Sequence, residues 1–265
     1  GRAGATRPPA ALVRHPRARG TGTRPGRAVA LRESETAALA AAAAVVVASP
    51  GTAEILVGGY PGPPARLTVA PPGTDRVAPA RGSGGPGVVL LSVGTLVPRK
   101  GHLDLVGALA ALTDLDWHLD IVGSRELDPA HAAAVAAAIE GHGLADRIRL
   151  VGALPAADLA AHYDAADLFV LASHYEGYGM AYAEALAHGL PVVGTTGGAV
   201  AGPVAEAAVL VPPGDKAALA LALRGLLSDR AARADRAAAA RRAAAGLPDW
   251  SASAGLIAAV IEGLA

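Results

Sequence analysis

The feature that most constrains the fold is a regular alternation of apolar runs with helix-like segments from residue 88 onward. The run 88–93 (VVLLSV) is continuously apolar, as expected of a strand buried on both faces of a sheet. Strands alternating with helices at this spacing predict an α/β fold with a doubly wound parallel sheet. The predicted strands are 88–93, 117–123, 148–153, 167–173, 191–195 and 208–212, and the predicted helices are 102–112, 129–142, 155–166, 179–188, 215–227 and 229–245.

A Pro- and Gly-dense tract, residues 71–87 (PPGTDRVAPARGSGGPG), predicts a linker between two domains. In the N-terminal part we expect a loop, a helix from about Ser34, a strand at 45–48, a short helix after Pro50 and a strand at 67–70. The resulting division is 1–75 for the N-terminal part, 76–87 for the linker, 88–247 for a complete C-terminal domain and 248–265 for a final helix.

The composition excludes several classes of protein. The chain has no cysteine, which excludes disulfide scaffolds, thiolate metal sites and cysteine nucleophiles. Its 23 Lys and Arg balance 23 Asp and Glu, which argues against a general binder of nucleic acid. The longest apolar run, 37–48, is well short of the roughly 20 residues that span a bilayer. The first 32 residues hold eight Arg and no acidic residue. They are either a basic tail or transit peptide, or, as we favour, a solvated part of an incomplete domain.

Two carboxylates, Glu176 and Glu184, flank a Gly-rich turn where a predicted strand ends and a helix begins. Gly177 and Gly179 permit close backbone approach, and the free N–H groups near Gly179 and Met180 form an anion site at the helix N-terminus. The Glu184 carboxylate suits the two hydroxyls of a ribose. The alternative is a pair of glutamates that favour the helix dipole and solvent. Spacing alone does not decide between them.

Two adjacent cations, Arg99 and Lys100, lie in GTLVPRKG (94–101), directly after the first strand of the C-terminal domain. Ligands of such sheets bind beyond the carboxyl ends of the strands. Arg99 and Lys100 there would clamp a diphosphate and stabilise its charge as it departs. A surface turn with solvated charges is the alternative. The Glu pair at the same sheet edge favours the clamp.

These stretches together resemble the retaining glycosyltransferases of family 4 (glycosyl transferases group 1), which have the GT-B fold. The resemblance lies in LLSVGTLVPRKGHLDLV, in IRLVGALPAADLAAHYDAADLFVLASHYEGYGMAYAEALAHGLPVVGTTGGA and in AVLVPPGD. It implies that Lys100, helped by Arg99, holds the donor diphosphate, that Glu176 faces the donor sugar, and that Glu184 binds the nucleotide ribose. It also implies that the final helix, 248–265, crosses back to the N-terminal part. The implied catalytic residues are Glu176, Lys100 and Arg99, and the implied donor-binding residues are Gly94, Thr95, Arg99, Lys100, Gly177, Tyr178, Gly179, Met180 and Glu184.

The implied reaction is retaining transfer from a UDP- or GDP-sugar to a sugar, lipid or small-molecule acceptor. The resemblance implies no cofactor and no metal, because Lys, Arg and a helix dipole supply the positive charge. We expect no nucleic-acid partner and a cytoplasmic location, and a peripheral contact with the inner membrane face is left open.

The sequence also departs from the family pattern. Thr95 and Gly202 stand where relatives commonly carry Arg and an acidic residue, and Arg14, beside His15, stands where His is usual. The family's N-terminal domain begins before residue 1, so we expect residues 1–75 to be a remnant of the acceptor domain. One alternative is therefore a non-catalytic nucleotide-sugar-binding module. Another is a GT-B epimerase or phosphorylase, which the paired-Glu context disfavours.

Overall fold

The computed structural model describes residues 9–14, 16, 25–61, 66–198, 200 and 202–264. Its larger sheet has six strands, all parallel, in the order β6-β5-β4-β7-β8-β9. This confirms the α/β class with a parallel sheet. The strands are β4 (Val88–Val93), β5 (Trp117–Val122), β6 (Ile148–Gly152), β7 (Leu168–Val170), β8 (Val192–Thr195) and β9 (Val209–Val211).

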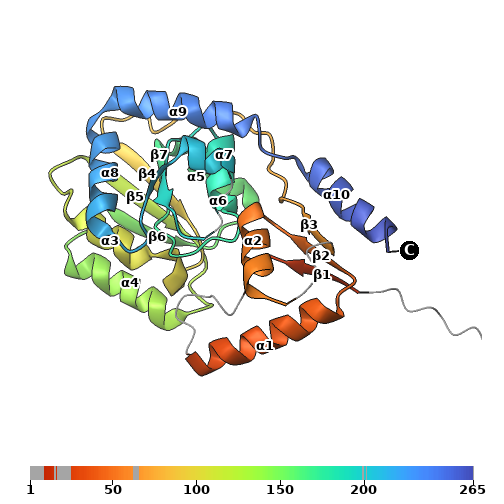
Figure 1. The fold of residues 1–265 in the computed structure, drawn as a ribbon. Helices are drawn as coiled ribbons and strands as arrows, with labels where there is room; N and C mark the ends of the chain where they lie inside the picture. The colour runs from red at the N-terminus through yellow and green to blue at the C-terminus, as the bar shows by residue number, and fades with distance from the viewer. Residues whose placement is uncertain are drawn as a thin grey trace, which may run out of the picture.

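Helices cover both faces of the larger sheet (Figure 1). Apolar side chains of α3, α4 and α8 form one cluster with the sheet, and those of α5, α6, α7 and α9 form the other. The sheet is thus buried on both faces, which explains its continuously apolar strands. The helices are α3 (His102–Ala110), α4 (Pro129–Gly141), α5 (Ala156–Ala165), α6 (Met180–Ala187), α7 (Gly202–Ala207), α8 (Lys216–Ser228) and α9 (Arg230–Ala244).

Two details differ from the sequence-based expectation. The strand expected at 167–173 ends at Val170, because the chain leaves the sheet there to form the turn that carries Glu176. The short helix α7 was not predicted, since its six residues begin with Gly202 and Pro203, which normally mark a loop.

The N-terminal part forms a parallel sheet in the order β1 (Ala10–Val13), β2 (Ala44–Val47), β3 (Leu67–Val69). The loop expected at its start contains β1. The helix expected from Ser34 is α1 (Pro25–Ala41), which begins nine residues earlier because proline suits the first turn of a helix. The helix α2 (Pro50–Gly59) follows β2 and packs its Leu56 into the small core of this sheet.

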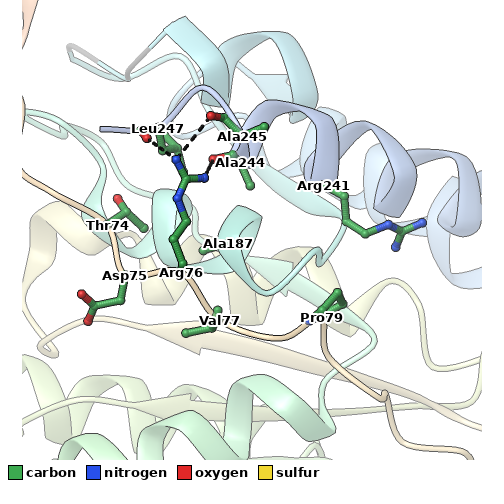
Figure 2. Close-up of a pocket in the computed structure, with 10 residues that line it drawn as sticks. All are labelled: Thr74, Asp75, Arg76, Val77, Pro79, Ala187, Arg241, Ala244, Ala245 and Leu247. Carbon is green, nitrogen blue, oxygen red and sulfur yellow. Dashed lines mark hydrogen bonds between the residues drawn. The ribbon is translucent and has the colours of Figure 1, made fainter. Parts of the chain in front are cut away.

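The Pro- and Gly-dense tract 71–87 and the start of α10 (Trp250–Glu262) lie side by side. Thr74 donates a backbone hydrogen bond to Pro248 at 2.8 Å, and a Cβ on Gly73 would lie 2.3 Å from the Trp250 nitrogen. Next to this crossing, the linker borders a pocket of 250 Å³ (Figure 2). In it Arg76 donates hydrogen bonds to the carbonyl oxygens of Ala244, Ala245 and Leu247 at the end of α9. Arg76 therefore satisfies backbone acceptors that a helix end leaves open.

No helix in the described part of the chain is long and apolar enough to cross a membrane.

Candidate active site

The candidate site lies where the strand order of the larger sheet reverses. The central strand β4 is bonded to β5 on one side and to β7 on the other, with Leu90 opposite Leu168. The chain builds outward from β4 to β6 first, and then from β7 to β9 on the other side. In doubly wound sheets such a switch point opens a crevice for ligands at the carboxyl ends of the strands. The Arg99–Lys100 turn follows β4, and the turn with Glu176 follows β7.

Lys100 and Glu176 form a buried ion pair in this crevice. The Lys100 Nζ lies 2.6 Å from the Glu176 Oε1, and the Ser173 hydroxyl donates to the same oxygen at 2.6 Å. The Arg99 Nη1 lies 3.6 Å from that oxygen. Glu176 is only 6% exposed, so its charge requires these partners. The structure thus brings together the three residues predicted to act on the donor, and adds Ser173, which the sequence analysis missed.

Backbone contacts join the two turns that carry this cluster. His174 donates its N–H to the Arg99 carbonyl at 2.7 Å, and the Arg99 guanidinium donates to the Tyr175 carbonyl at 3.1 Å. Gly101 has a φ of +67°, and a Cβ there would lie 1.9 Å from the Ala172 carbonyl oxygen. Only glycine permits that approach, so Gly101 fixes the position of Lys100 relative to β7.

Other glycines make room for the ion pair. A Cβ on Gly94 would lie 3.2 Å from the Lys100 side chain, so Gly94 gives space to the lysine stem. Gly198, with a φ of +87°, approaches the Glu176 carbonyl, and Glu176 donates its N–H to Gly197 at 2.9 Å. The loop after β8 therefore packs against the backbone of the Glu176 turn and helps to fix its position.

The helix α6 begins at this crevice, and the N–H groups of its first turn have no acceptor within the helix. Gly179 is its N-cap with a φ of +92°, and no side chain caps the helix. The bond from Ala183 N–H to the Gly179 carbonyl closes its first turn, so the N–H groups of residues 180–182 precede it. Such donors, with the helix dipole, favour an anion. Tyr178 has its side chain buried in the apolar cluster that also contains residues of α6.

Glu184 borders an open pocket of 210 Å³, which is lined by α5, α6, the tract 73–77 and the start of α10. The Tyr163 hydroxyl donates to the Glu184 Oε2 at 2.9 Å, a contact that sequence spacing did not reveal. Burial raises the pKa of Glu184, and the Tyr163 hydrogen bond opposes that rise. Met180 and Trp250 also line the pocket. One carboxylate oxygen is thus held by Tyr163 while the carboxyl group borders open space.

Two histidines, His102 and His174, lie near the crevice, but its cations are Arg99 and Lys100. His102 follows this pair and is fully buried, and burial lowers the pKa of His102 to about 4, so the imidazole is neutral. His174 is bound to Asp104, with its Nε2 2.8 Å from the carboxylate. No group of three or more His, Asp or Glu side chains in the described ranges is placed to hold a metal ion.

The residues at which the sequence departs from the family pattern are spread over the structure. Thr95 is half-buried in the turn after β4, and Gly202 begins α7 with open space around its Cα. Arg14 is exposed at the end of β1, and His15 lies outside the described residues.

Comparison with known proteins identifies the family. The model of the family described as glycosyl transferases group 1 matches residues 87–229, which hold the whole crevice. The chain belongs to this family. A curated relative, the D-inositol 3-phosphate glycosyltransferase of Kineococcus radiotolerans, is 35% identical over 202 residues, which cover 66% of this chain and 46% of the relative. Mannosylfructose-phosphate synthase of Agrobacterium fabrum is 30% identical and covers 58% and 38% of the two chains.

Solved structures confirm the GT-B class for this group 1 chain. Sucrose-phosphate synthase from Thermosynechococcus elongatus superposes with a TM-score of 0.84 at 26% identity, over 96% of this chain and 67% of that one. HepE from Anabaena, solved with UDP and glucose, gives a TM-score of 0.81 at 19% identity, over 96% and 71% of the two chains. The chain spans about half the length of the curated relatives it matches.

Proposed function

We propose that the chain binds a nucleoside-diphosphate sugar and transfers its sugar to an acceptor with retention of anomeric configuration. The observation that carries this proposal is the Lys100–Glu176 pair, with Arg99 beside it, at the switch point of the sheet and next to the start of α6. Two cations lie beside the turn that leads into α6, whose first N–H groups have no partner within the helix, and this combination fits the two charges of a diphosphate.

In this mechanism Lys100 and Arg99 bind the diphosphate, and the N–H groups at the start of α6 bind its remaining oxygens. The bond between the anomeric carbon and the diphosphate oxygen breaks, and its electron pair stays on the diphosphate. The acceptor hydroxyl attacks the same face and gives its proton to that departing oxygen. Fixed positive groups favour this step because they stabilise charge where it develops. Glu176 faces the sugar, and Glu184 holds the ribose.

The donor in this proposal is a UDP- or GDP-sugar, and no further cofactor or metal takes part. One relative is named as GDP-mannose-dependent, and a structural neighbour was solved with UDP and glucose, which supports both bases as candidates. The acceptor is a sugar, a lipid or a small molecule. We also propose a cytoplasmic location, with any membrane contact peripheral.

Calorimetric titration with UDP and GDP tests donor binding. We expect one of them to bind, and Lys100→Ala to weaken its binding about tenfold or more. The matched control is Lys216→Ala, which removes the chain's other lysine, more than half exposed, and should leave the affinity unchanged. If neither nucleotide binds, or if Lys100→Ala binds as well as the parent, the proposal is wrong.

Transfer is tested next, with UDP-glucose and GDP-mannose as donors and NMR of the anomeric proton as the readout. An α-donor should give an α-product. Binding without hydrolysis or transfer would instead identify a nucleotide-sugar-binding module.

A further inference from the structure

Two hydroxyls of the N-terminal part reach into the Glu176 turn of the C-terminal domain. Ser49 and Thr52, at the start of α2, donate to the carbonyl oxygen of Gly177 at 2.7 and 3.2 Å. Gly177 lies between Glu176 and the start of α6. We propose that Ser49 and Thr52 form a latch that holds the N-terminal part over the donor site and fixes the Gly177 peptide.

Helix capping explains only part of this arrangement. The Ser49 Oγ accepts the Thr52 N–H at 3.1 Å, as an N-cap serine does. Capping uses a lone pair of Ser49, so its hydroxyl can still donate, with the Gly177 oxygen at 2.7 Å and the Thr52 Oγ1 at 2.9 Å as acceptors. It makes no use of the Thr52 hydroxyl. Both spare protons lie within reach of the same Gly177 oxygen.

The two hydroxyls of the latch are buried, so their hydrogen bonds bear on the free energy that holds the two parts together. Ser49 is 1% exposed and Thr52 is fully buried, so neither hydroxyl has water as an alternative partner. Ala48, just before them, packs in the same apolar cluster as Tyr178 and Tyr182 of the C-terminal domain. The part-buried Gly177 oxygen accepts from both hydroxyls only while the two parts are joined. These hydrogen bonds contribute net stability, so they favour the joined position over one in which the two parts separate.

The latch bears on chemistry because of where Gly177 lies. The orientation of its peptide sets the backbone that leads into Gly179 and the free N–H groups of α6. On the proposed function, those groups bind the donor diphosphate, so this part of the inference rests on that function. Ser49 and Thr52 are positioning residues in this view and touch no substrate.

The chain has no cysteine, so a pair of spin labels can be introduced without background. We choose Ala37→Cys on α1 and Glu140→Cys on α4, which are both exposed. Pulsed EPR should give one narrow distance in the parent. In Ser49→Ala/Thr52→Val the distribution should broaden about twofold or more. Thr52→Val alone keeps the side-chain shape and the cap, and should show an intermediate width. Thr52→Ser should restore the parent width.

The matched control is Asp215→Ala, which removes the N-cap of α8 away from the latch and should leave the distance unchanged. A broad distribution in the parent, or a narrow one in the folded double variant, would overturn the latch. Titration with UDP and GDP separates the two proposals. We expect the double variant to bind the nucleotide about fivefold more weakly, because fewer molecules hold the competent turn. If the parent binds no nucleotide, the donor function fails while the EPR widths still decide the latch.

Discussion

At the scale of single residues, Glu184 shows a conflict between stability and function. Its carboxyl group is partly buried, and burial raises its pKa, so the folded state binds protons more readily than the unfolded chain. Ionisation of Glu184 therefore lowers the free energy of unfolding, and this loss develops as the pH rises through the pKa of the carboxyl group. A residue that costs stability and borders an open pocket is a candidate for binding a ligand.

Glu184→Gln tests this conflict. At neutral pH the variant should melt between the parent temperature and about 4 °C higher, because it removes a buried charge and still accepts from Tyr163. At acidic pH, where Glu184 is protonated, the two melting temperatures should converge. Nucleotide affinity should fall about tenfold, since a neutral amide accepts hydroxyl protons less strongly. Melting curves at both pH values and calorimetry measure these effects. A less stable variant at neutral pH would contradict the argument.

The Lys100–Glu176 pair carries a second prediction. Lys100→Ala should lower the free energy of unfolding by about 3 kcal/mol, because Glu176 keeps a buried charge without its nearest cation. Lys100→Ala/Glu176→Gln should recover most of that loss, since no buried charge remains. Urea unfolding of the parent, both single variants and the double variant forms a complete cycle. Additive effects would show that the two side chains do not interact.

The sequence indicated both partners of this pair but not the pairing. Lys100 and Glu176 are 76 residues apart, and they meet because β4 and β7 are neighbours in the sheet. Neighbouring strands that are distant in sequence cannot be read from local patterns. Tyr163 was missed for a similar reason, since it contacts Glu184 from another helix, 21 residues away in the sequence. Ser173 is only three residues from Glu176, but their contact depends on the fold of a turn that was predicted as strand.

At the scale of elements, local patterns predicted the C-terminal domain well. Strands buried on both faces are continuously apolar, and helix starts at Pro129 and after Asp215 carry the expected proline and cap. The failures have physical causes. The segment after Val170 looks like strand because Leu171 and Ala172 are apolar and buried, although it lies beyond the end of β7. The start of α1 lies in an Arg- and Gly-rich tract in which no apolar period marks a helix.

Two glycines in turns between elements, Gly101 and Gly143, give a prediction in which the second serves as the control for the first. Gly101 and Gly143 both have a φ of +67°, but a Cβ on Gly143 meets open space. Gly143→Ala should cost about 1 kcal/mol, the strain of the left-handed backbone alone. Gly101→Ala should cost at least about 3 kcal/mol, because its Cβ would also displace β7 from the Lys100 turn. Urea unfolding measures both. Equal losses would show that the close approach to Ala172 is relaxed in solution.

At the scale of the whole molecule, two sheets of unequal size share one chain. The N-terminal core is small and comprises the buried residues Ala42, Val45, Val47, Leu56 and Tyr60. The larger sheet has an extensive apolar cluster on each face. Small cores contribute little net stability, so the N-terminal part depends on its contacts with the larger domain at the latch and the linker crossing.

Nucleotide binding should therefore stabilise the two parts unequally. Trp117 is fully buried in β5, and Trp250→Phe makes it the only tryptophan, so its fluorescence reports the larger sheet. Far-UV circular dichroism also reports α1 and α2. A nucleotide at 100 times its Kd should stabilise the larger domain by about 2.7 kcal/mol. That should raise the Trp117 transition by about 5–10 °C.

The dichroism signal should begin to fall at a lower temperature than the Trp117 signal, and added nucleotide should widen the gap between them. The widening is expected because the ligand's cations, Arg99 and Lys100, belong to the larger domain, while the N-terminal part gains only through the latch. A single transition that both probes report, and that moves as one with nucleotide, would mean that the two cores unfold together. The latch and the linker crossing would then transmit the whole binding energy to the N-terminal sheet.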